Sequence, residues 1–203
     1  MSRLVVVEYV SLDGVVQAPG HAGEDPEGGF AAGGWTGPFM AEHRRYNTEL
    51  FQTAGAFLLG RLTYQIFAAY WPTVTDPDDQ VARALNTLPK YVASTSLDDP
   101  GWQPATVIGG DLPTRVRKLK AEPGRPILTL GSPSLVQGLL RDDLIDEYQL
   151  WLHPVVLGRG KRLFADGGPA AALRLVDGRT TGGGLVILTY QVAGRPAGME
   201  VGR

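Results

Sequence analysis

Short apolar runs rich in Val, Ile and Leu recur along the chain, separated by Gly, Pro and charged residues. Runs of this length and composition are typical of strands buried in a sheet. They predict eight strands, at residues 4–10, 56–59, 91–93, 106–108, 127–130, 148–152, 173–176 and 185–192.

Segments with helical periodicity separate several of these strands. The apolar side chains of residues 39–54 recur on one helical stripe, and Pro38 suits a first turn. Residues 78–88 begin with aspartates, which favour a helix N-terminus, and their apolar side chains share one face. Three further helices are expected after Gly60, after Asp111 and over residues 134–140.

Strands that alternate with helices indicate a largely parallel sheet with helices on both faces. The last two strands are joined only by a glycine-rich turn at residues 182–184, so they must run antiparallel. We therefore predict an α/β protein with a mixed, mostly parallel sheet and antiparallel C-terminal strands. Because neither an internal repeat nor a linker divides the chain, residues 1–193 are expected to form a single domain and residues 194–203 a flexible C-terminal tail.

The segment 11–37 is long for a loop and contains eight glycines without apolar periodicity. Loops of this length are uncommon inside a domain unless they are functional or disordered. The segment follows the first strand, at the edge where open α/β sheets bind ligands. Two interpretations are open, namely a flap that closes over a pocket and a floppy insertion.

Composition narrows the function classes. The 203 residues include 19 Lys plus Arg against 21 Asp plus Glu, and this near balance argues against nucleic acid as a partner. There is no cysteine, and the three histidines lack ligand spacing, so we expect no metal site. Because the first residues lack the apolar core and cleavage site of a leader, we expect none, and no apolar stretch approaches about 18 residues. We expect a cytoplasmic protein that does not enter a membrane.

Two predicted strand-to-helix junctions carry residues suited to a phosphate group. At the first, Gly60 permits close backbone approach, the helix amides attract an anion, and Arg61 and Thr63 could grip it. The plainer interpretation is a solvated arginine and a threonine that only starts the helix. Residues 131–134 form a second junction of this kind, although neither the G-x-G-x-x-G fingerprint nor a Walker loop is present.

Other polar residues have two interpretations each. Ser94 and Thr95 follow the third strand, where their hydroxyls could bind ribose or phosphate, or serve only the turn. A basic turn with Arg159, Lys161 and Arg162 could bind a substrate phosphate, or be solvated.

Asp13, Glu42 and His43 are the acid or base candidates near the segment 11–37. A carboxyl group in a partly apolar pocket has a raised pKa and can donate or relay a proton. The plainer interpretation makes Asp13 a turn residue, and Glu42 and His43 ordinary residues of a helix face.

Several of these motifs occur together, in order, in one known family. Residues 11–14 read S-L-D-G, residues 60–63 read G-R-L-T, and residues 144–147 read L-I-D-E. They match the S-x-D-G, G-R-x-T and L-[VI]-D-E motifs of that family, and residues 131–135 match its G-G-x-x-L motif. Over residues 5–190 the chain resembles the dihydrofolate-reductase-like superfamily, and within it the stand-alone form of the reductase domain of bacterial riboflavin biosynthesis. It departs where Ser132 replaces the second glycine of the pair and Leu130 replaces an acidic residue.

The resemblance implies a three-layer α/β/α fold, NADPH as hydride donor, and a pterin-like or aminopyrimidine-like heterocycle as the small-molecule substrate. Asp13, ahead of Glu42, is the expected catalytic acid. The implied cofactor-binding residues are Val16 near the nicotinamide, Gly60, Arg61 and Thr63 at the phosphates, Ser94 and Thr95 at the 2'-phosphate end, and Gly131, Ser132, Ser134 and Leu135 at the pyrophosphate.

These observations lead us to expect an NADPH-dependent reductase of the riboflavin-pathway or dihydrofolate reductase type. The alternatives are a non-catalytic nucleotide or small-molecule binding protein on the same scaffold, and a plain homodimeric interaction module. The apolar last strand is compatible with a homodimer in every case.

Overall fold

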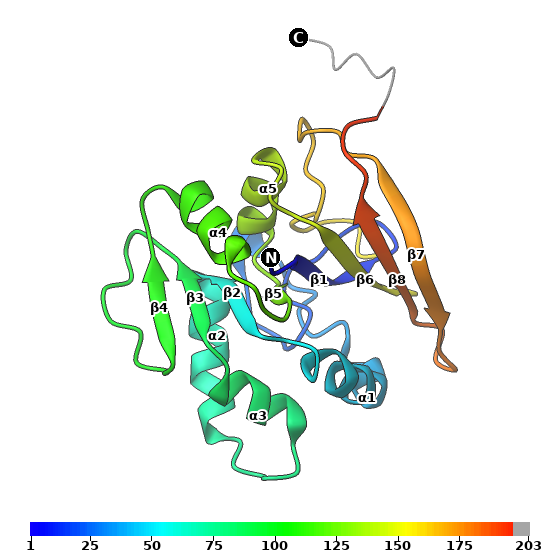
Figure 1. Ribbon diagram of the computed structural model, residues 1–203. Helices are drawn as coiled ribbons and strands as arrows, with labels where there is room; N and C mark the ends of the chain where they lie inside the picture. Colours follow the sequence, from blue (N-terminus) through cyan, green and yellow to red (C-terminus); the bar gives the residue numbers. More distant parts are fainter. Residues whose placement is uncertain (197–203) are drawn as a thin grey trace.

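The computed structural model describes residues 1–196, which form one eight-stranded sheet in the order β4-β3-β2-β5-β1-β6-β8-β7 (Figure 1). The strands are β1 (Leu4–Ser11), β2 (Ala56–Gly60), β3 (Lys90–Ala93), β4 (Ala105–Ile108), β5 (Ile127–Leu130), β6 (Glu147–His153), β7 (Leu173–Thr180) and β8 (Val186–Val192). The α-helices are α1 (Met40–Phe51), α2 (Arg61–Tyr70), α3 (Gln80–Thr87), α4 (Leu112–Ala121) and α5 (Pro133–Arg141). Every strand and helix predicted from the pattern is present.

The direction of the strands follows the prediction as well. From β4 to β6 all neighbouring strands are parallel, whereas β8 pairs antiparallel with both β6 and β7. The mixed sheet with antiparallel C-terminal strands is therefore confirmed.

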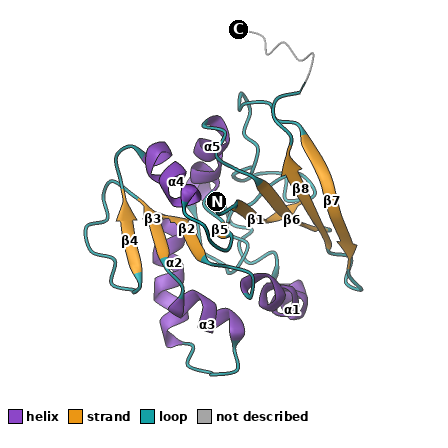
Figure 2. Cartoon of the chain, viewed as in Figure 1, coloured by secondary structure: helices purple, strands orange, loops and turns teal. Residues whose placement is uncertain are grey.

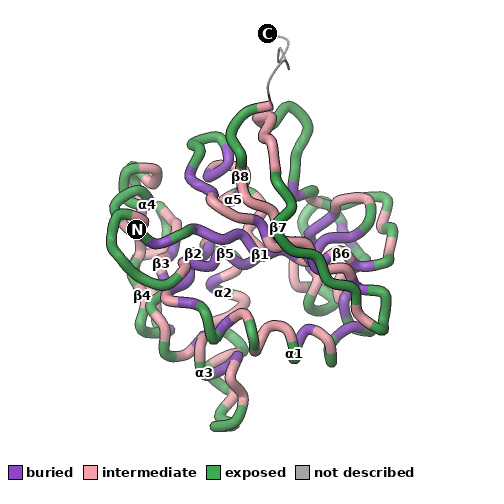
Figure 3. Tube along the Cα trace, turned by 45° about the vertical axis from the view of Figure 1, so that its right-hand side comes forward, coloured by how far each residue is buried: buried purple, intermediate pink, exposed green. Residues whose placement is uncertain are grey.

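Alternation along the central strand divides the core into two layers. Val5 and Val7 of β1 pack on the side of α1, α2 and α3, while Leu4 and Val6 pack on the side of α4 and α5. The helices accordingly lie on both sides of the sheet (Figure 2), and the central strands are its most buried part, in contrast to the exposed β7 (Figure 3). The three-layer arrangement is confirmed.

The two central strands β1 and β5 separate at the carboxyl edge of the sheet. Val7 and Leu130 form their last pair, beyond which β1 continues along β6 alone as far as Ser11 and His153. The chain leaving β1 proceeds to α1 on one face, and the chain leaving β5 proceeds to α5 on the other. Such a switch point leaves a crevice between the strands, and ligands of open α/β sheets bind there.

The segment 11–37 is a packed wall rather than a floppy insertion. Val15, Ala18, Phe30 and Trp35 form a buried cluster of their own. The indole N–H of Trp35 donates to the carbonyl of Gln17 at 2.9 Å. Because the segment has its own buried apolar cluster and internal hydrogen bond, it can form one stable side of a cleft.

The described residues after β8 pair with the segment before β7. Ala193 donates to the carbonyl of Ala172, and the N–H of Ala172 donates to the carbonyl of Gly194. The rest of the predicted tail, residues 197–203, lies outside the described residues. Within residues 1–196 no helix has the length and apolar character that crossing a bilayer requires.

Tyr64 connects α2 to the segment before β4, and this contact supports a prediction about stability. Its buried hydroxyl donates to the carbonyl of Trp102 at 3.0 Å and accepts from the N–H of Trp102 at 2.9 Å. Leaving these groups unpaired costs about 1 to 3 kcal/mol. We expect Tyr64→Phe to lower the free energy of unfolding in urea by about this amount.

The control is Tyr70→Phe on the same helix, because the Tyr70 side chain is exposed and its hydroxyl has no hydrogen bond within residues 1–196. Its effect should stay within about 0.5 kcal/mol. Equal losses for the two variants would contradict the role given to the Tyr64 hydroxyl.

Candidate functional site

A cleft of about 1030 Å³ follows the carboxyl edge of the sheet. Its walls come from the ends of β1 to β5, the length of α2, the first turn of α5, residues of α1 and α3, and the segment 11–37. All ten residues expected to contact a cofactor line it: Val16, Gly60, Arg61, Thr63, Ser94, Thr95, Gly131, Ser132, Ser134 and Leu135. The structure thus brings together positions that are up to 119 residues apart in the sequence (16 to 135).

The two phosphate-type junctions touch each other through Ser132. The N–H of Gly60 donates to the Ser132 hydroxyl at 2.9 Å, and that hydroxyl donates to Oγ1 of Thr63 at 2.8 Å. A Cβ on Gly60 would lie only 2.9 Å from Ser132 Oγ, so glycine is required for this approach. Ser132 itself has a left-handed backbone conformation, with φ of 63°. Ser132, which replaces the second glycine of the family motif, therefore forms part of the cleft wall and connects its two junctions.

The N-termini of α2 and α5 both open onto this wall. Their N-cap residues, Gly60 and Ser132, make no side-chain capping bond, and the first turn of each helix has no acidic residue. The first N–H groups of a helix lack partners within the helix and carry a partial positive charge. Arg61 is exposed beside them, held by a 3.0 Å hydrogen bond from its guanidinium to Gln65. This donor set fits the phosphates of a dinucleotide.

The hydroxyl residues after β3 also line the cleft, although one has a structural task. Ser94 Oγ accepts from the N–H groups of Ser96 and Leu97, at 3.1 and 3.0 Å. The turn interpretation therefore holds for Ser94, whose hydroxyl hydrogen stays free to donate. Thr95 is exposed at the same edge.

Asp13, the first candidate for the acid, does not line the cleft. Its carboxylate accepts from the Ser11 hydroxyl at 2.7 Å and from the N–H groups of Leu157 and Gly158 at 3.1 and 2.8 Å. These hydrogen bonds hold the pKa of Asp13 at about 2. The residue clamps two loops together, and this corrects the expectation of a substrate-side acid.

Glu42, the second candidate, also lies outside the cleft. Its Oε1 accepts from the N–H of Gly183 at 3.0 Å, in the turn between β7 and β8. Glu42 lies on the side of α1 that faces the β7–β8 hairpin. In contrast, His43, the next residue, faces the cleft.

The basic turn after β6 binds the segment 11–37. Lys161 Nζ lies 2.6 Å from both Asp25 and Glu27, and the guanidinium of Arg162 donates to the carbonyl of Asp13 at 2.6 Å. Arg159 donates to the carbonyls of Gly28 and Gly29. The three cations therefore fasten this wall of the cleft, a role that neither earlier interpretation included.

A pair of histidines stands on the α1 side of the crevice. His153 Nδ1 donates to the carbonyl of Trp151 at 2.8 Å, which leaves Nε2 of His153 as an acceptor for Nε2–H of His43, also at 2.8 Å. This assignment leaves Nδ1 of His43 as a hydrogen-bond acceptor. Burial, with His153 beside it, lowers the pKa of His43 to about 4, so the pair is neutral at neutral pH.

Aromatic rings and one amide complete this end of the cleft. The Tyr9 ring stacks on His43 at 4.2 Å between centroids, with 16° between the planes. Its hydroxyl accepts from Asn47 at 2.6 Å, and burial raises the pKa of Tyr9 to about 12. A flat, neutral surface results, with Arg44 of α1 nearby on the rim.

Glu8 is a buried carboxyl group at the point where β1 and β5 separate. It lies on β1, lines the cleft and is 3% exposed, and its Oε1 has no hydrogen-bond partner among the described residues. Burial raises the pKa of Glu8 well above its ordinary value. The sequence carried a signal for it, because a single charge inside an otherwise apolar central strand is unusual.

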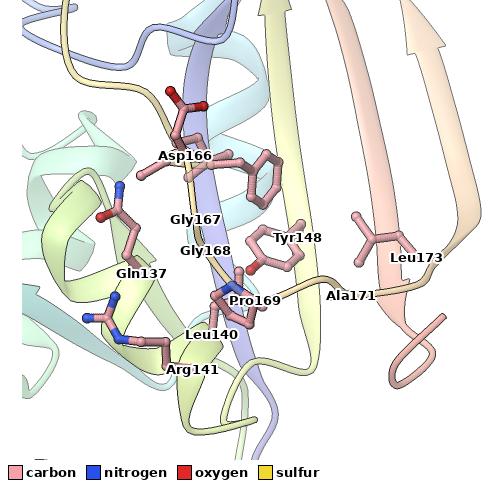
Figure 4. Close-up of a pocket in the computed structure, with 13 residues that line it drawn as sticks. Gln137, Leu140, Arg141, Tyr148, Asp166, Gly167, Gly168, Pro169, Ala171 and Leu173 are labelled. Atoms are coloured by element: carbon pink, nitrogen blue, oxygen red, sulfur yellow. The ribbon is translucent and has the colours of Figure 1, made fainter. Parts of the chain in front are cut away.

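A second, smaller cavity of about 490 Å³ lies between α5, β6 and residues 163–173 (Figure 4). Tyr148 and Phe164 pack edge to face there, with ring centroids 5.7 Å apart. Residues predicted from the sequence to act in the site are not part of its lining. In residues 1–196, no three His, Asp or Glu side chains gather as they would around a metal ion.

Comparisons with known proteins agree with this architecture. A family model described as RibD C-terminal domain matches residues 3–187. The uncharacterized protein YyaP of Bacillus subtilis (strain 168) is 31% identical over 196 residues, which cover 93% of this chain and 94% of YyaP. The uncharacterized protein YwjB of the same organism is 30% identical over 85% of this chain and 88% of its own length.

Solved structures show the same fold at lower identity. A riboflavin biosynthesis protein from Shewanella sp. PV-4 superposes with a TM-score of 0.64 at 20% identity, over 95% of this chain and 99% of that one. A Thermotoga maritima diaminohydroxyphosphoribosylaminopyrimidine deaminase/5-amino-6-(5-phosphoribosylamino)uracil reductase gives 0.60 at 12% identity, over 95% of this chain and 57% of the other. The dihydrofolate-reductase-like fold expected from the resemblance is confirmed.

The Ser132 contact can be tested by two substitutions that both remove its hydroxyl. Ser132→Ala keeps a side chain in the left-handed conformation, whereas Ser132→Gly relieves it, and that conformation costs a residue with a Cβ about 1 kcal/mol. We expect Ser132→Ala to lower the free energy of unfolding by about 1 to 2 kcal/mol, and Ser132→Gly by roughly 1 kcal/mol less. Urea unfolding measures both, and a larger loss for glycine would refute the assignment.

The buried carboxyl predicts a dependence of stability on pH. Because the folded pKa of Glu8 is raised, the native state keeps a proton that the unfolded chain releases, so stability falls as pH rises from the unfolded pKa towards the folded one. Glu8→Gln removes this loss. We expect the melting temperature of the variant, relative to the wild type, to increase between pH 5 and pH 8, by about 2 to 4 °C for each kcal/mol.

The matched control is Glu122→Gln, since Glu122 is exposed. The difference in melting temperature between this variant and the wild type should change much less between pH 5 and pH 8. A Glu8→Gln difference that is flat from pH 5 to pH 8 would show that Glu8 is ionised in the folded protein.

Proposed function

The chain belongs to the RibD C-terminal domain family, and from this premise we propose that it is an NADPH-dependent reductase of a pterin-like or aminopyrimidine-like heterocycle. The riboflavin-pathway 5-amino-6-(5-phosphoribosylamino)uracil reductase and dihydrofolate reductase are the two reaction types considered. The reductase name carried by the Thermotoga maritima neighbour belongs to that protein and supports the first type here.

The observation that carries the proposal is the meeting of two uncapped helix N-termini in one wall of the cleft. Gly60, Ser132 and Thr63 join them through two hydrogen bonds of 2.9 and 2.8 Å. A dinucleotide has phosphates spaced along its length, so two adjacent anion-binding turns suit it better than a single phosphate. Thr63 accepts from Ser132 and keeps its own hydroxyl hydrogen for such a ligand.

Arg61 supports the choice of NADPH over NADH. It is exposed at the N-terminus of α2, on the cleft side, and its guanidinium has donors beyond the one bound to Gln65. A guanidinium recognises the extra 2'-phosphate with charge-assisted bonds.

The other end of the cleft suits a flat heterocycle. Tyr9 and His43 offer a stacked, neutral surface, and His43 Nδ1 can accept a hydrogen bond from a ring N–H. Asn47 and Arg44 stand beside them on α1. The low pKa of His43 keeps this surface uncharged at neutral pH.

When bound, the cofactor supplies a hydride from its nicotinamide ring. The chain's own tasks are to hold both molecules and to limit the access of water. The crevice between β1 and β5 positions the rings, and the segment 11–37, fastened by Lys161 and Arg162, covers one side. These ion pairs and hydrogen bonds explain how the glycine-rich segment 11–37 can form one wall of the cleft.

One observation favours the alternative, a non-catalytic nucleotide or small-molecule binding protein. Both carboxylates expected as the acid, Asp13 and Glu42, bind backbone N–H groups outside the cleft. Such a protein would be stabilised by ligands without oxidising NADPH. Turnover assays with pterin, aminouracil and quinone acceptors separate the two functions.

The role of Arg61 yields a direct prediction. Arg61→Ala should weaken NADPH binding by about 10- to 100-fold, because a charge-assisted hydrogen bond contributes about 1.5 to 3 kcal/mol. NADH affinity should change by less than about threefold, since NADH lacks the 2'-phosphate. Isothermal titration calorimetry on the purified protein measures both.

Arg117→Ala makes the same charge change at an exposed position of α4 that does not line the cleft. It should leave both affinities close to wild type. Equal losses for NADPH and NADH in Arg61→Ala would move Arg61 to the shared pyrophosphate, and wild-type protein that binds neither nucleotide would overturn the proposed function.

A further inference from the structure

Glu8 lies at the floor of the crevice between β1 and β5. Val7 and Leu130 make the last pair of these strands, so the next residues on each side are Glu8 and Gly131. Gly131 contributes no side chain, and its positive φ of 56° turns the chain away into the junction before α5. The carboxyl group of Glu8 therefore lines the cleft where the two strands separate.

The surroundings leave this carboxyl without a protein partner. Oε1 of Glu8 is buried and has no hydrogen bond within residues 1–196, and the same holds for the hydroxyls of Thr129 and Tyr148. Thr129 on β5 and Tyr148 on β6 both pair with Val6, two residues before Glu8 on the same face of the sheet. Of these three residues Glu8 lines the cleft, whereas Tyr148 lines the smaller cavity and Thr129 lines neither. Buried polar atoms nearly always have partners, so the unpartnered oxygen of Glu8 points to a partner in the cleft that is not part of the chain.

The charge state of Glu8 follows from the groups that face it. Tyr148 is the titratable residue of β6 on the same face of the sheet as Glu8, and burial, together with the proximity of Glu8, raises the pKa of Tyr148. The strand β5 contributes Thr129, and the α5 side contributes apolar residues such as Val136 and Leu139. No ion pair involves Glu8 in the described residues, and burial raises its pKa well above the ordinary value, which favours the protonated form.

We propose that Glu8, as a neutral carboxyl group, binds an amide-type edge of the ligand in the crevice. Its O–H donates to a carbonyl oxygen of the ligand, and its C=O accepts from the neighbouring N–H. The inference rests on the proposed function, to which it adds a ligand-binding residue that the sequence motifs do not contain.

The pairing follows from the chemistry of the acid. A protonated carboxyl has one donor beside one acceptor in a plane, whereas a carboxylate has acceptors alone. The complementary group is a carboxamide or a lactam, in which C=O and N–H stand side by side. Two molecules of the proposed reaction carry such an edge, the nicotinamide of the dinucleotide and the ring of a uracil-like or pterin-like heterocycle.

Titration calorimetry with three probes tests the proposal on wild-type protein, Glu8→Gln and Glu8→Leu. The probes are NADP⁺, its fragment 2'-phospho-ADP-ribose, which lacks nicotinamide, and 5,6-diaminouracil. Glutamine keeps a donor beside an acceptor, so Glu8→Gln should bind within about threefold of wild type. The affinity of Glu8→Leu should fall about tenfold or more for the probe whose amide edge contacts Glu8, and should change little for 2'-phospho-ADP-ribose.

The dependence on pH gives a readout that a structural role would not produce. Wild-type affinity for that probe should fall as pH rises and Glu8 loses its proton, while Glu8→Gln should stay flat. Cooperative thermal unfolding of each variant confirms that it is folded. If Glu8→Leu does not fold, Glu8→Gln and the pH series decide alone.

The arms separate this inference from the proposed function. Dependence on Glu8 for NADP⁺ places the nicotinamide at the crevice floor, and dependence for diaminouracil places the heterocycle there. Binding of 2'-phospho-ADP-ribose with no dependence on Glu8 in either other probe, and no pH effect, overturns the Glu8 proposal and leaves the dinucleotide site intact. Diaminouracil binding that depends on Glu8 without any nucleotide binding overturns the dinucleotide site instead, and no binding of any probe overturns both.

Discussion

The site depends on a single constraint, the separation of β1 and β5 after the pair Val7 and Leu130. The two strands send their chains to helices on opposite faces, so nothing in the sheet can fill the space between their carboxyl ends. The same separation presents the first turn of α5 to the cleft and leaves Glu8 without a neighbour on β5. Backbone topology thus creates both the binding space and the unpartnered carboxyl.

Charge is distributed unevenly along the cleft. One part has two helix N-termini and Arg61, all able to donate to phosphate, while another has the neutral His43 stacked on Tyr9, with Arg44 nearby. A ligand that is anionic at one end and flat and uncharged at the other matches this gradient. This distribution of donors would favour one orientation of such a ligand in the cleft.

Much of this architecture could be predicted because it depends on neighbours along the chain. Strand β1 and helix α3 follow from local periodicity, and the junction at Gly60 follows from a short motif. The acid could not be found in this way, because Asp13 binds N–H groups at residues 157 and 158, more than 140 positions away. Ser132 was equally hard to interpret, since its hydroxyl bridges to Gly60 only in the folded sheet. Such long-range contacts leave no local pattern, although the lone charge of Glu8 in an apolar strand did leave one.

The most direct test of the central claim is a map of backbone amide shifts, by ¹H–¹⁵N NMR, as NADPH is added to the labelled protein. If the two helix N-termini jointly bind the phosphates, the largest shifts fall on the amides of Leu62, Thr63, Ser134 and Leu135, and they saturate together. Shifts confined to one junction, or located away from the carboxyl edge of the sheet, would contradict the account.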